Sequence, residues 1–234
     1  MTRVNGSGVS TRNPFGPTFG KGAAKGAEKL DSLGHQIQDE LFGKKKPREL
    51  DPDDVDCAAL LARLHAYRKR IARLAGDDED DYTLALADGT IASIDASGKI
   101  YVGKQFLLST SGVLDLQVGV IAHEIGHRPK RWDEYRAERP QTRAELHELC
   151  RLEETYADFF AGRALAELGM QCEPVCAFLL ELEEGPHPEY FPAKLRGDVI
   201  REGFVDGKRK SDLRKKMFPA LAKRVNPKLD LGSG

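Results

Sequence analysis

The sequence predicts an α+β protein that is mostly helical and carries one small three-stranded antiparallel sheet. Amphipathic patterns with the helical period cover most of residues 49–226, whereas 82–102 shows short apolar runs separated by Asp-Gly and Ser-Gly turns. The chain has 234 residues, of which 40% are apolar and 31% charged, as expected for a globular domain. We expect that domain at 49–226, between an N-terminal tail at 1–48 and a C-terminal tail at 227–234.

Charge and hydropathy limit the kind of partner that the chain takes. The formal net charge is −1, with basic residues gathered at both ends and acidic residues in the body at 51–200. Solvated tails explain this distribution more simply than nucleic-acid binding, so we do not expect nucleic acid as a partner. No apolar run is long enough to cross a bilayer, so no membrane span is expected.

The N-terminus and the cysteines indicate a compartment. The first ten residues lack the hydrophobic segment of a secretory signal peptide. Cysteine is rare and scattered, which argues against a disulfide framework. The sequence therefore predicts a soluble, cytoplasmic protein, with export without a leader left open.

The N-terminal tail has two parts with different patterns. Residues 1–29 are rich in Gly, Ser, Thr and Asn without a period, and are predicted to be disordered. Between 27 and 42, apolar residues at spacings of three and four indicate a weak amphipathic helix. This helix could dock on a partner or delivery machinery, cover an active site as a pro-segment, or pack on the domain. The run Lys44–Pro47 predicts a linker.

The first part of the domain combines one helix with all the predicted strands. Asp51 and Pro52 predict the start of a helix that ends at Gly76. Strands are then expected at 82–86, 90–94 and 99–102. Because Asp-Gly and Ser-Gly are typical of hairpin turns, we expect consecutive strands to pair antiparallel and to leave an exposed edge strand.

The second part of the domain is predicted to be helical. Thr142 and Glu145 form the sequence pattern of a capping box, and Gly169 ends that long helix after Leu168. Pro129 ends an earlier helix. Further helices are expected at 103–109, 112–128, 173–182, 192–204 and 211–225.

The segment 118–128 contains the order His-Glu-x-x-His, at His123, Glu124 and His127. On a helix the two histidines lie one turn apart on the same face, where neutral imidazoles can bind zinc. The glutamate can then deprotonate a zinc-bound water that attacks a peptide carbonyl. The alternative is a helix that carries these residues only for packing or solubility.

A catalytic zinc needs a third protein ligand. His127 is followed by Arg-Pro-Lys, which excludes the metzincin pattern and leaves a carboxylate of the helix at 142–168. Glu154 shares a stripe with small residues, whereas Glu153 lies on the side of bulky ones. Asp158, one turn after Glu154, is placed to accept a hydrogen bond from a zinc-bound imidazole.

The His-Glu-Ile-Gly-His motif, followed in the next helix by Glu154-Thr-Tyr-Ala-Asp158, resembles gluzincin zinc peptidases of the HtpX and CAAX prenyl endopeptidase group. The stretch 87–102 is similar to the edge hairpin of that group. The resemblance implies a zincin-like metallopeptidase domain that holds one zinc per chain. In it His123, His127 and Glu154 would bind the metal, Glu124 would be the general base, and Asp158 would support a ligand.

The same group tends to carry a His-Pro pair and an arginine downstream that steady the oxyanion. His187-Pro188 and Arg196 resemble these residues, although their separation is longer than usual. Tyr190 lies between them and is an alternative donor. Most members are embedded in membranes, and the first fifty residues of this chain have no counterpart in the group.

Together these features predict a zinc-dependent endopeptidase, a hydrolase of protein or peptide substrates. The substrate is expected to lie antiparallel along the edge strand, because such a strand hydrogen-bonds an extended backbone. The residues expected to contact it are Ile91, Ala92, Ser93 and Ile94. Two alternatives remain: a latent effector whose tail docks on a partner or autoinhibits the domain, and a pseudo-enzyme whose helices merely pack.

Overall fold

The computed structural model describes residues 46–129, 142–183 and 185–225, with side chains as far as residue 213. The predicted disorder at 1–29, the predicted helix at 27–42 and the predicted C-terminal tail at 227–234 lie outside these residues. The described chain is α+β and mostly helical, as predicted.

The sheet is mixed and has four strands, so the prediction of three antiparallel strands is wrong. The strands are β1 (Arg48–Glu49), β2 (Thr83–Asp88), β3 (Ala92–Ile94) and β4 (Lys99–Gly103). Their order is β1-β2-β4-β3, with β2 parallel to β4 and the other pairs antiparallel.

The difference arises at the two turns. Residues 95–98 form the expected hairpin turn, in which Gly98 has a φ of 86°. After Gly89, however, the chain does not return along β2 but crosses the end of β4. A Cβ on Gly103 would lie 1.8 Å from the carbonyl oxygen of Thr90, so only glycine permits this crossing. The crossing places β3 at the far edge of the sheet.

Two helices differ from their predicted bounds. Helix α2 begins at Ala58 rather than after Asp51: the segment 51–57 forms turns instead, in which Asp51 accepts hydrogen bonds from the backbone of Asp53 and Asp54. The two patterns expected at 192–204 and 211–225 form one continuous helix, α7. The helices are α2 (Ala58–Ala75), α3 (Lys104–Ser109), α4 (Leu114–Gly126), α5 (Arg143–Leu168), α6 (Glu173–Leu182) and α7 (Ala193–Val225), with a 3₁₀ turn η1 (Glu79–Asp81).

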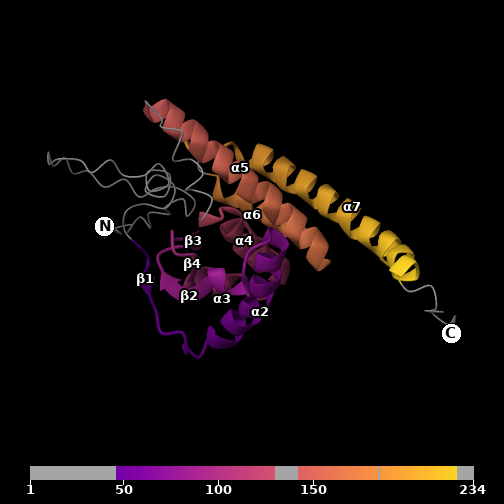
Figure 1. The fold of residues 1–234 in the computed structure, drawn as a ribbon. Helices are drawn as coiled ribbons and strands as arrows, with labels where there is room; N and C mark the ends of the chain where they lie inside the picture. Colours follow the sequence, from indigo (N-terminus) through magenta and orange to yellow (C-terminus); the bar gives the residue numbers. More distant parts are fainter. Residues whose placement is uncertain (1–45, 130–141, 184, 226–234) are drawn as a thin grey trace, which may run out of the picture.

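Helix α4 lies between the sheet with α2 on one side and the long helices α5 and α7 on the other (Figure 1). Glycines let these helices approach closely. A Cβ on Gly126 of α4 would lie 2.8 Å from the Cα of Ala157, and one on Gly162 would lie 1.9 Å from the carbonyl oxygen of Ile200. The close approach brings side chains of α4, α5 and α7 to one point.

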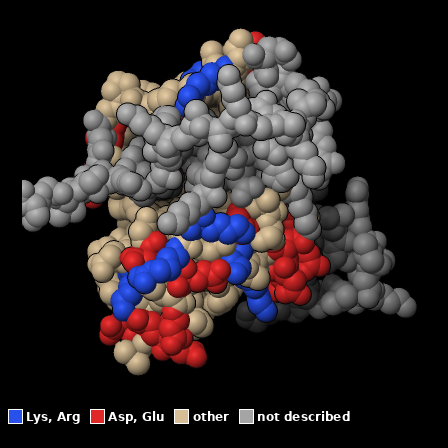
Figure 2. Space-filling view, turned by 90° about the vertical axis from the view of Figure 1, so that its left-hand side faces the viewer, with Lys and Arg blue, Asp and Glu red and all other residues tan. Residues whose placement is uncertain are grey.

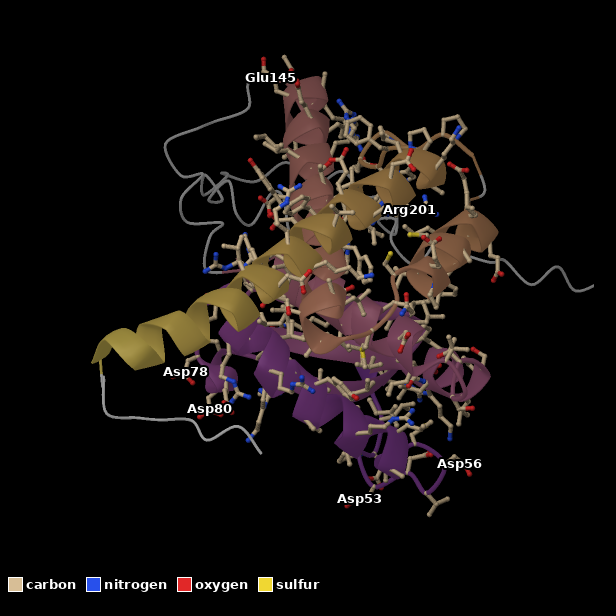
Figure 3. All side chains as sticks on the ribbon, turned by 90° about the vertical axis from the view of Figure 1, so that its right-hand side faces the viewer. Asp53, Asp56, Asp78, Asp80, Glu145 and Arg201 are labelled. Carbon is tan, nitrogen blue, oxygen red and sulfur yellow. The ribbon has the colours of Figure 1, made fainter. Side chains whose placement is uncertain are left out.

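The described surface carries acidic and basic side chains side by side (Figure 2). The acidic residues Asp53, Asp56, Asp78 and Asp80 project outward at the two ends of α2 (Figure 3). Asp78 caps η1, which gives the acidic residues at 78–81 a structural role. Within the described residues, no helix combines the length and the apolar content that a membrane span requires.

Candidate metal centre

Helix α4 is buried from its third residue to its end, and His123, Glu124 and the following residue His127 are thereby removed from solvent. Every residue from Leu116 to Gly126 is buried, because most of them are apolar and α2, β3, α5 and α6 pack around the helix. A buried helix seldom carries three ionisable side chains unless partners compensate for their desolvation. Neighbouring charged or polar groups must therefore compensate for the desolvation of these three side chains.

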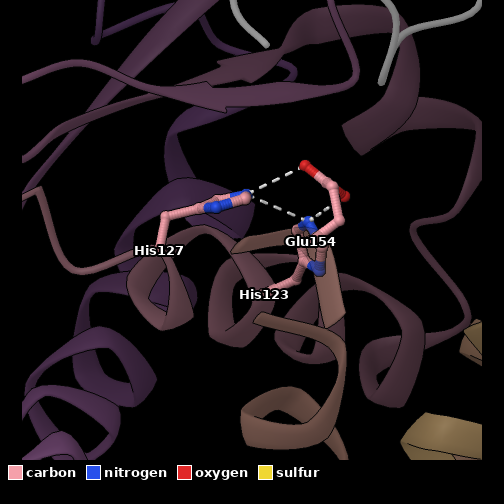
Figure 4. A group of neighbouring side chains, drawn as sticks. All are labelled: His123, His127 and Glu154. Carbon is pink, nitrogen blue, oxygen red and sulfur yellow. Dashed lines mark hydrogen bonds and ion pairs between the residues drawn. The ribbon is translucent and has the colours of Figure 1, made fainter. Parts of the chain in front are cut away.

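His123, His127 and Glu154 converge, as Figure 4 shows. The Nε2 atoms of the two histidines are 3.2 Å apart. The Glu154 carboxylate oxygens lie 3.4 Å from His123 Nε2 and 3.5 Å from His127 Nε2. Three ligand atoms so close together, all buried, can hold a metal ion.

Small residues of α5 let Glu154 reach the histidines. Cys150, Ala157 and Ala161, which share its stripe, are completely buried against their neighbours. The helix bounds agree with the prediction: Thr142 accepts the hydrogen bond of Glu145 N, and Gly169 adopts the left-handed conformation after Leu168.

Asp158 and Arg196 contact the converging residues: Asp158 contacts His123, and Arg196 contacts Glu154. The Asp158 carboxylate lies 2.9 Å from His123 Nδ1, which leaves Nε2 directed at Glu154. Arg196 donates to both oxygens of Asp158, at 2.7 and 2.9 Å, and to Glu154 at 2.9 Å. Arg196 thus cross-links two carboxylates of α5, in addition to lying near the site as expected.

The buried charges shift one another's pKa values. Burial alone would lower the pKa of His123, but Glu154 and Asp158 outweigh it and raise that pKa to about 10. Burial lowers the pKa of His127 to about 3. Burial also opposes ionisation of Asp158, yet Arg196 and His123 lower its pKa to about 2. Burial likewise opposes ionisation of Glu154, but Arg196 and His123 lower its pKa, so Glu154 and Asp158 both keep their negative charges.

Glu124 lies beside this group and is buried with an unused oxygen. Its Oε2 has no hydrogen-bond partner among the described residues, while its carboxylate accepts the backbone N–H of Ile94. Burial raises the pKa of Glu124 to about 7, so the side chain can exchange a proton near neutral pH.

His187 and Tyr190 occupy different positions relative to the group. Tyr190 is buried, its ring lies 5.2 Å from the Arg196 guanidinium, and burial and Glu154 raise its pKa well above the ordinary value. His187 Nδ1 instead lies 2.7 Å from Glu189, a fully buried carboxylate that also lies 3.1 Å from His147 Nε2. Glu189 and His147 had no signal in the sequence, because 42 positions separate them.

The predicted substrate strand lies at the edge of the sheet next to α4. Gly103 N donates to Ile91 O, and Asp95 N donates to Lys99 O, so Ile91 and Asp95 face β4. By alternation, Ala92 and Ile94 direct their backbone groups to the other side. Ser93 Oγ is buried and has no hydrogen-bond partner among the described residues.

The charges of the site suit a divalent cation. Glu124, Glu154 and Asp158 carry three negative charges when ionised, and Arg196 balances one of them. Without a metal, protonated His123 balances another; a divalent ion that displaces this proton would balance the remaining two. Two imidazoles and one carboxylate also form a donor set of the kind that binds transition metals. The residues present therefore fit a metal ion.

No family model, no curated protein and no solved structure matches the chain.

Proposed function

We propose that the protein is a zinc-dependent endopeptidase. The observation that carries the proposal is the buried group of His123, His127 and Glu154, with the unused carboxylate oxygen of Glu124 beside it. A merely structural metal site would complete its ligand set with protein atoms, whereas a catalytic site has three protein ligands and a base.

Zinc is the metal that this donor set favours. Two histidines and one glutamate supply borderline donors in a compact arrangement, which suits zinc better than the oxygen-only cages of calcium or magnesium. When bound, zinc supplies Lewis acidity that polarises a carbonyl and makes water more acidic.

Glu124 and Tyr190 provide the other catalytic groups. Glu124 takes the proton from the attacking water and passes it to the leaving amine, for which a pKa of about 7 is suitable. Tyr190 keeps its proton at all ordinary pH values and donates a hydrogen bond to the oxyanion. His187 is the less suitable donor because it pairs with Glu189.

Strand β3 provides a place for the substrate backbone. The Ala92 N–H and the Ile94 carbonyl point outward and can pair with an extended peptide, which would then pass the base Glu124, the acceptor of the Ile94 N–H. Recognition through the backbone gives broad specificity unless a side-chain pocket adds to it.

Hydrolysis of a peptide library tests this proposal. Wild-type protein with zinc should cleave the library, and Glu124→Gln should lose about a thousandfold or more in kcat/KM while retaining zinc. Glu148→Gln, an exposed change on α5, is the matched control and should cleave normally. Undiminished cleavage by the Glu124→Gln variant would contradict the proposed mechanism.

A further inference from the structure

Arg128, the residue directly after the predicted ligand His127, has a backbone conformation that arginine rarely adopts. Its φ is 44°, and no other residue with a Cβ atom has a positive φ in the described part of the chain. This left-handed conformation is unfavourable for residues with a Cβ atom but not for glycine. Helices α2 and α5 end in the same conformation, and each has a glycine there, at Gly76 and Gly169. Glycine would end α4 with less strain, which indicates that the arginine side chain has a role of its own.

The Arg128 side chain binds a fixed partner at the corner between α2 and β2. Its guanidinium donates two hydrogen bonds to the Asp77 carboxylate, from Nη2 to Oδ1 at 2.6 Å and from Nε to Oδ2 at 3.2 Å. Such a bidentate pair fixes orientation as well as distance. Asp77 N donates to Ala72 O at 3.0 Å, and the hydroxyl of the buried Tyr82 donates to Asp77 Oδ2 at 2.7 Å. Because burial and Asp77 raise the pKa of Tyr82, this donor keeps its proton.

The ion pair adjoins the part of α4 that the helix itself constrains least. His127 has helical dihedral angles, φ −63° and ψ −27°, but it follows Gly126, the last residue of the helix. Helix ends fray because their last carbonyl groups lack partners within the helix. Arg128 N donates to Ile125 O at 3.0 Å and so closes the final turn. The conformation of residue 128 therefore determines where the His127 side chain can lie.

A metal ion tolerates little movement of its ligands. Metal–ligand distances vary by only about 0.2 Å around their usual values, so a small shift of the last turn of α4 would withdraw His127. Gly126, before this histidine, packs against Ala157 of α5, and Arg128, after it, is bound to Asp77. His127 thus lies between two residues that different parts of the fold hold in place.

We propose that Arg128 is a positioning residue for the metal ligand His127. Its ion pair with Asp77 holds the end of α4 in the conformation that directs His127 Nε2 at Glu154. The inference rests on the metal centre of the proposed function and adds a residue through which the α2–β2 corner acts on zinc binding.

Replacing Arg128 by glycine separates the ion pair from the shape of the backbone. Glycine retains the left-handed conformation and removes the strain of a Cβ atom, whereas the contact with Asp77 is lost. The variant should therefore fold, and denaturant unfolding of the metal-free protein checks this. If residue 128 served only to end α4, Arg128→Gly would bind zinc like the wild type. We expect instead a loss of roughly tenfold or more in zinc affinity, as is usual when a group that orients a ligand is removed.

Two measurements on the full chain test the inference. Competition with a chelator gives the zinc affinity, and the visible spectrum of the cobalt(II)-substituted protein reports the ligand geometry. Asp77→Ala should weaken zinc binding as much as Arg128→Gly, and the double variant should lose no more than either, because all three lack the same ion pair. Arg128→Lys should recover part of the affinity. Arg73→Met, the matched control, removes an exposed arginine ion pair from the same corner and should retain the wild-type affinity and spectrum.

The outcomes separate this inference from the proposed function. Wild-type zinc affinity in Arg128→Gly would overturn the inference, and so would a weaker affinity with an unchanged cobalt spectrum, which indicates only a general loss of stability. Additive losses in the double variant would also contradict it. If the predicted losses occur but the wild type hydrolyses no peptide, the positioning role stands and the endopeptidase proposal fails. If the wild type binds neither zinc nor cobalt, both proposals fail.

Discussion

Arg196 is the side chain that connects the buried charges of the site. It donates to Glu154 and to both oxygens of Asp158, and Asp158 in turn lies 2.9 Å from His123. Without Arg196, two carboxylates would be buried with less compensating charge. We therefore regard Arg196 as a positioning residue for Glu154 and, through Asp158, for His123.

Replacing Arg196 by methionine should destabilise the protein by about 3–5 kcal/mol, because it breaks a buried charge pair. The variant should also bind zinc more weakly, since Glu154 loses its orienting donor, and Arg196→Lys should recover part of the affinity. Denaturant unfolding and competition with a chelator measure the two effects. Arg201→Met, which affects an exposed pair on the same helix, should change neither by much.

Tyr190→Phe should reduce kcat by about a hundredfold and leave zinc affinity unchanged, since only the hydroxyl that donates to the oxyanion is removed. Steady-state kinetics on one peptide measures the change. Tyr156→Phe, an exposed tyrosine of α5, is the control. Equal kcat values for Tyr190→Phe and wild type would assign oxyanion stabilisation to another group.

For individual side chains, the sequence predicted those positions in the site that depend only on spacing along one helix. His123, Glu124 and His127 lie within one helical turn and a half, so their relative placement follows from helix geometry. The cross-link from Arg196 to Asp158 spans 38 positions, and no local pattern specifies such a contact. The pairing of His187 with Glu189 is local, but its burial against His147 is not.

Among the elements, the α4–α5 contact sets the geometry of the metal centre. Gly126 allows α4 to approach Ala157, and Ala157 lies one turn from Glu154. A methyl group at position 126 would lie 2.8 Å from a backbone atom, which cannot move without shifting the whole of α5.

Gly126→Ala should therefore cost about 1–3 kcal/mol of unfolding free energy and weaken zinc binding, because Glu154 moves away from the histidines. Gly112→Ala is a suitable control, since a Cβ there would meet nothing within 4 Å. Thermal unfolding with and without zinc measures both effects. A variant with wild-type zinc affinity would show that the helix spacing does not control the site.

The β3–β4 turn should make the fold sensitive to acid. Burial alone would raise the pKa of Asp95, but hydrogen bonds from Lys46 and Ser97 outweigh it and lower that pKa to about 2. A lowered folded-state pKa contributes stability above the ordinary value of about 3.8 and loses it as the pH falls through about 2.

Asp95→Asn should accordingly reduce stability at pH 7 by about 2 kcal/mol, and the difference from wild type should shrink between pH 4 and about 2. Denaturant unfolding across this range tests it. Asp88→Asn, which changes an exposed pair on β2, should show little effect at any pH.

Helix ends were easier to predict than strand order. The long helix α5 carries a capping residue and a terminal glycine, and both signals act within a few residues. The sheet depends on where the chain travels after Gly89. That path follows from the close approach of Thr90 to Gly103, thirteen positions away, rather than from the Asp-Gly turn.

In the molecule as a whole, the site lies where helices α4, α5 and α7 and strand β3 come together. Helix α4 contributes His123 and the base, the residue after it is His127, α5 contributes Glu154, and α7 contributes Arg196, while Ile94 of β3 donates to the base. Figure 1 shows how these elements are arranged. The central claim is that this meeting point is a zinc site with three protein ligands.

Zinc content under chelator competition tests that claim most directly. Wild-type protein should retain about one zinc per chain, and the alanine variants of His123, His127 and Glu154 should each lose at least about tenfold in affinity, whereas Glu148→Ala should match the wild type. Zinc retained with wild-type affinity by all three ligand variants would contradict the account.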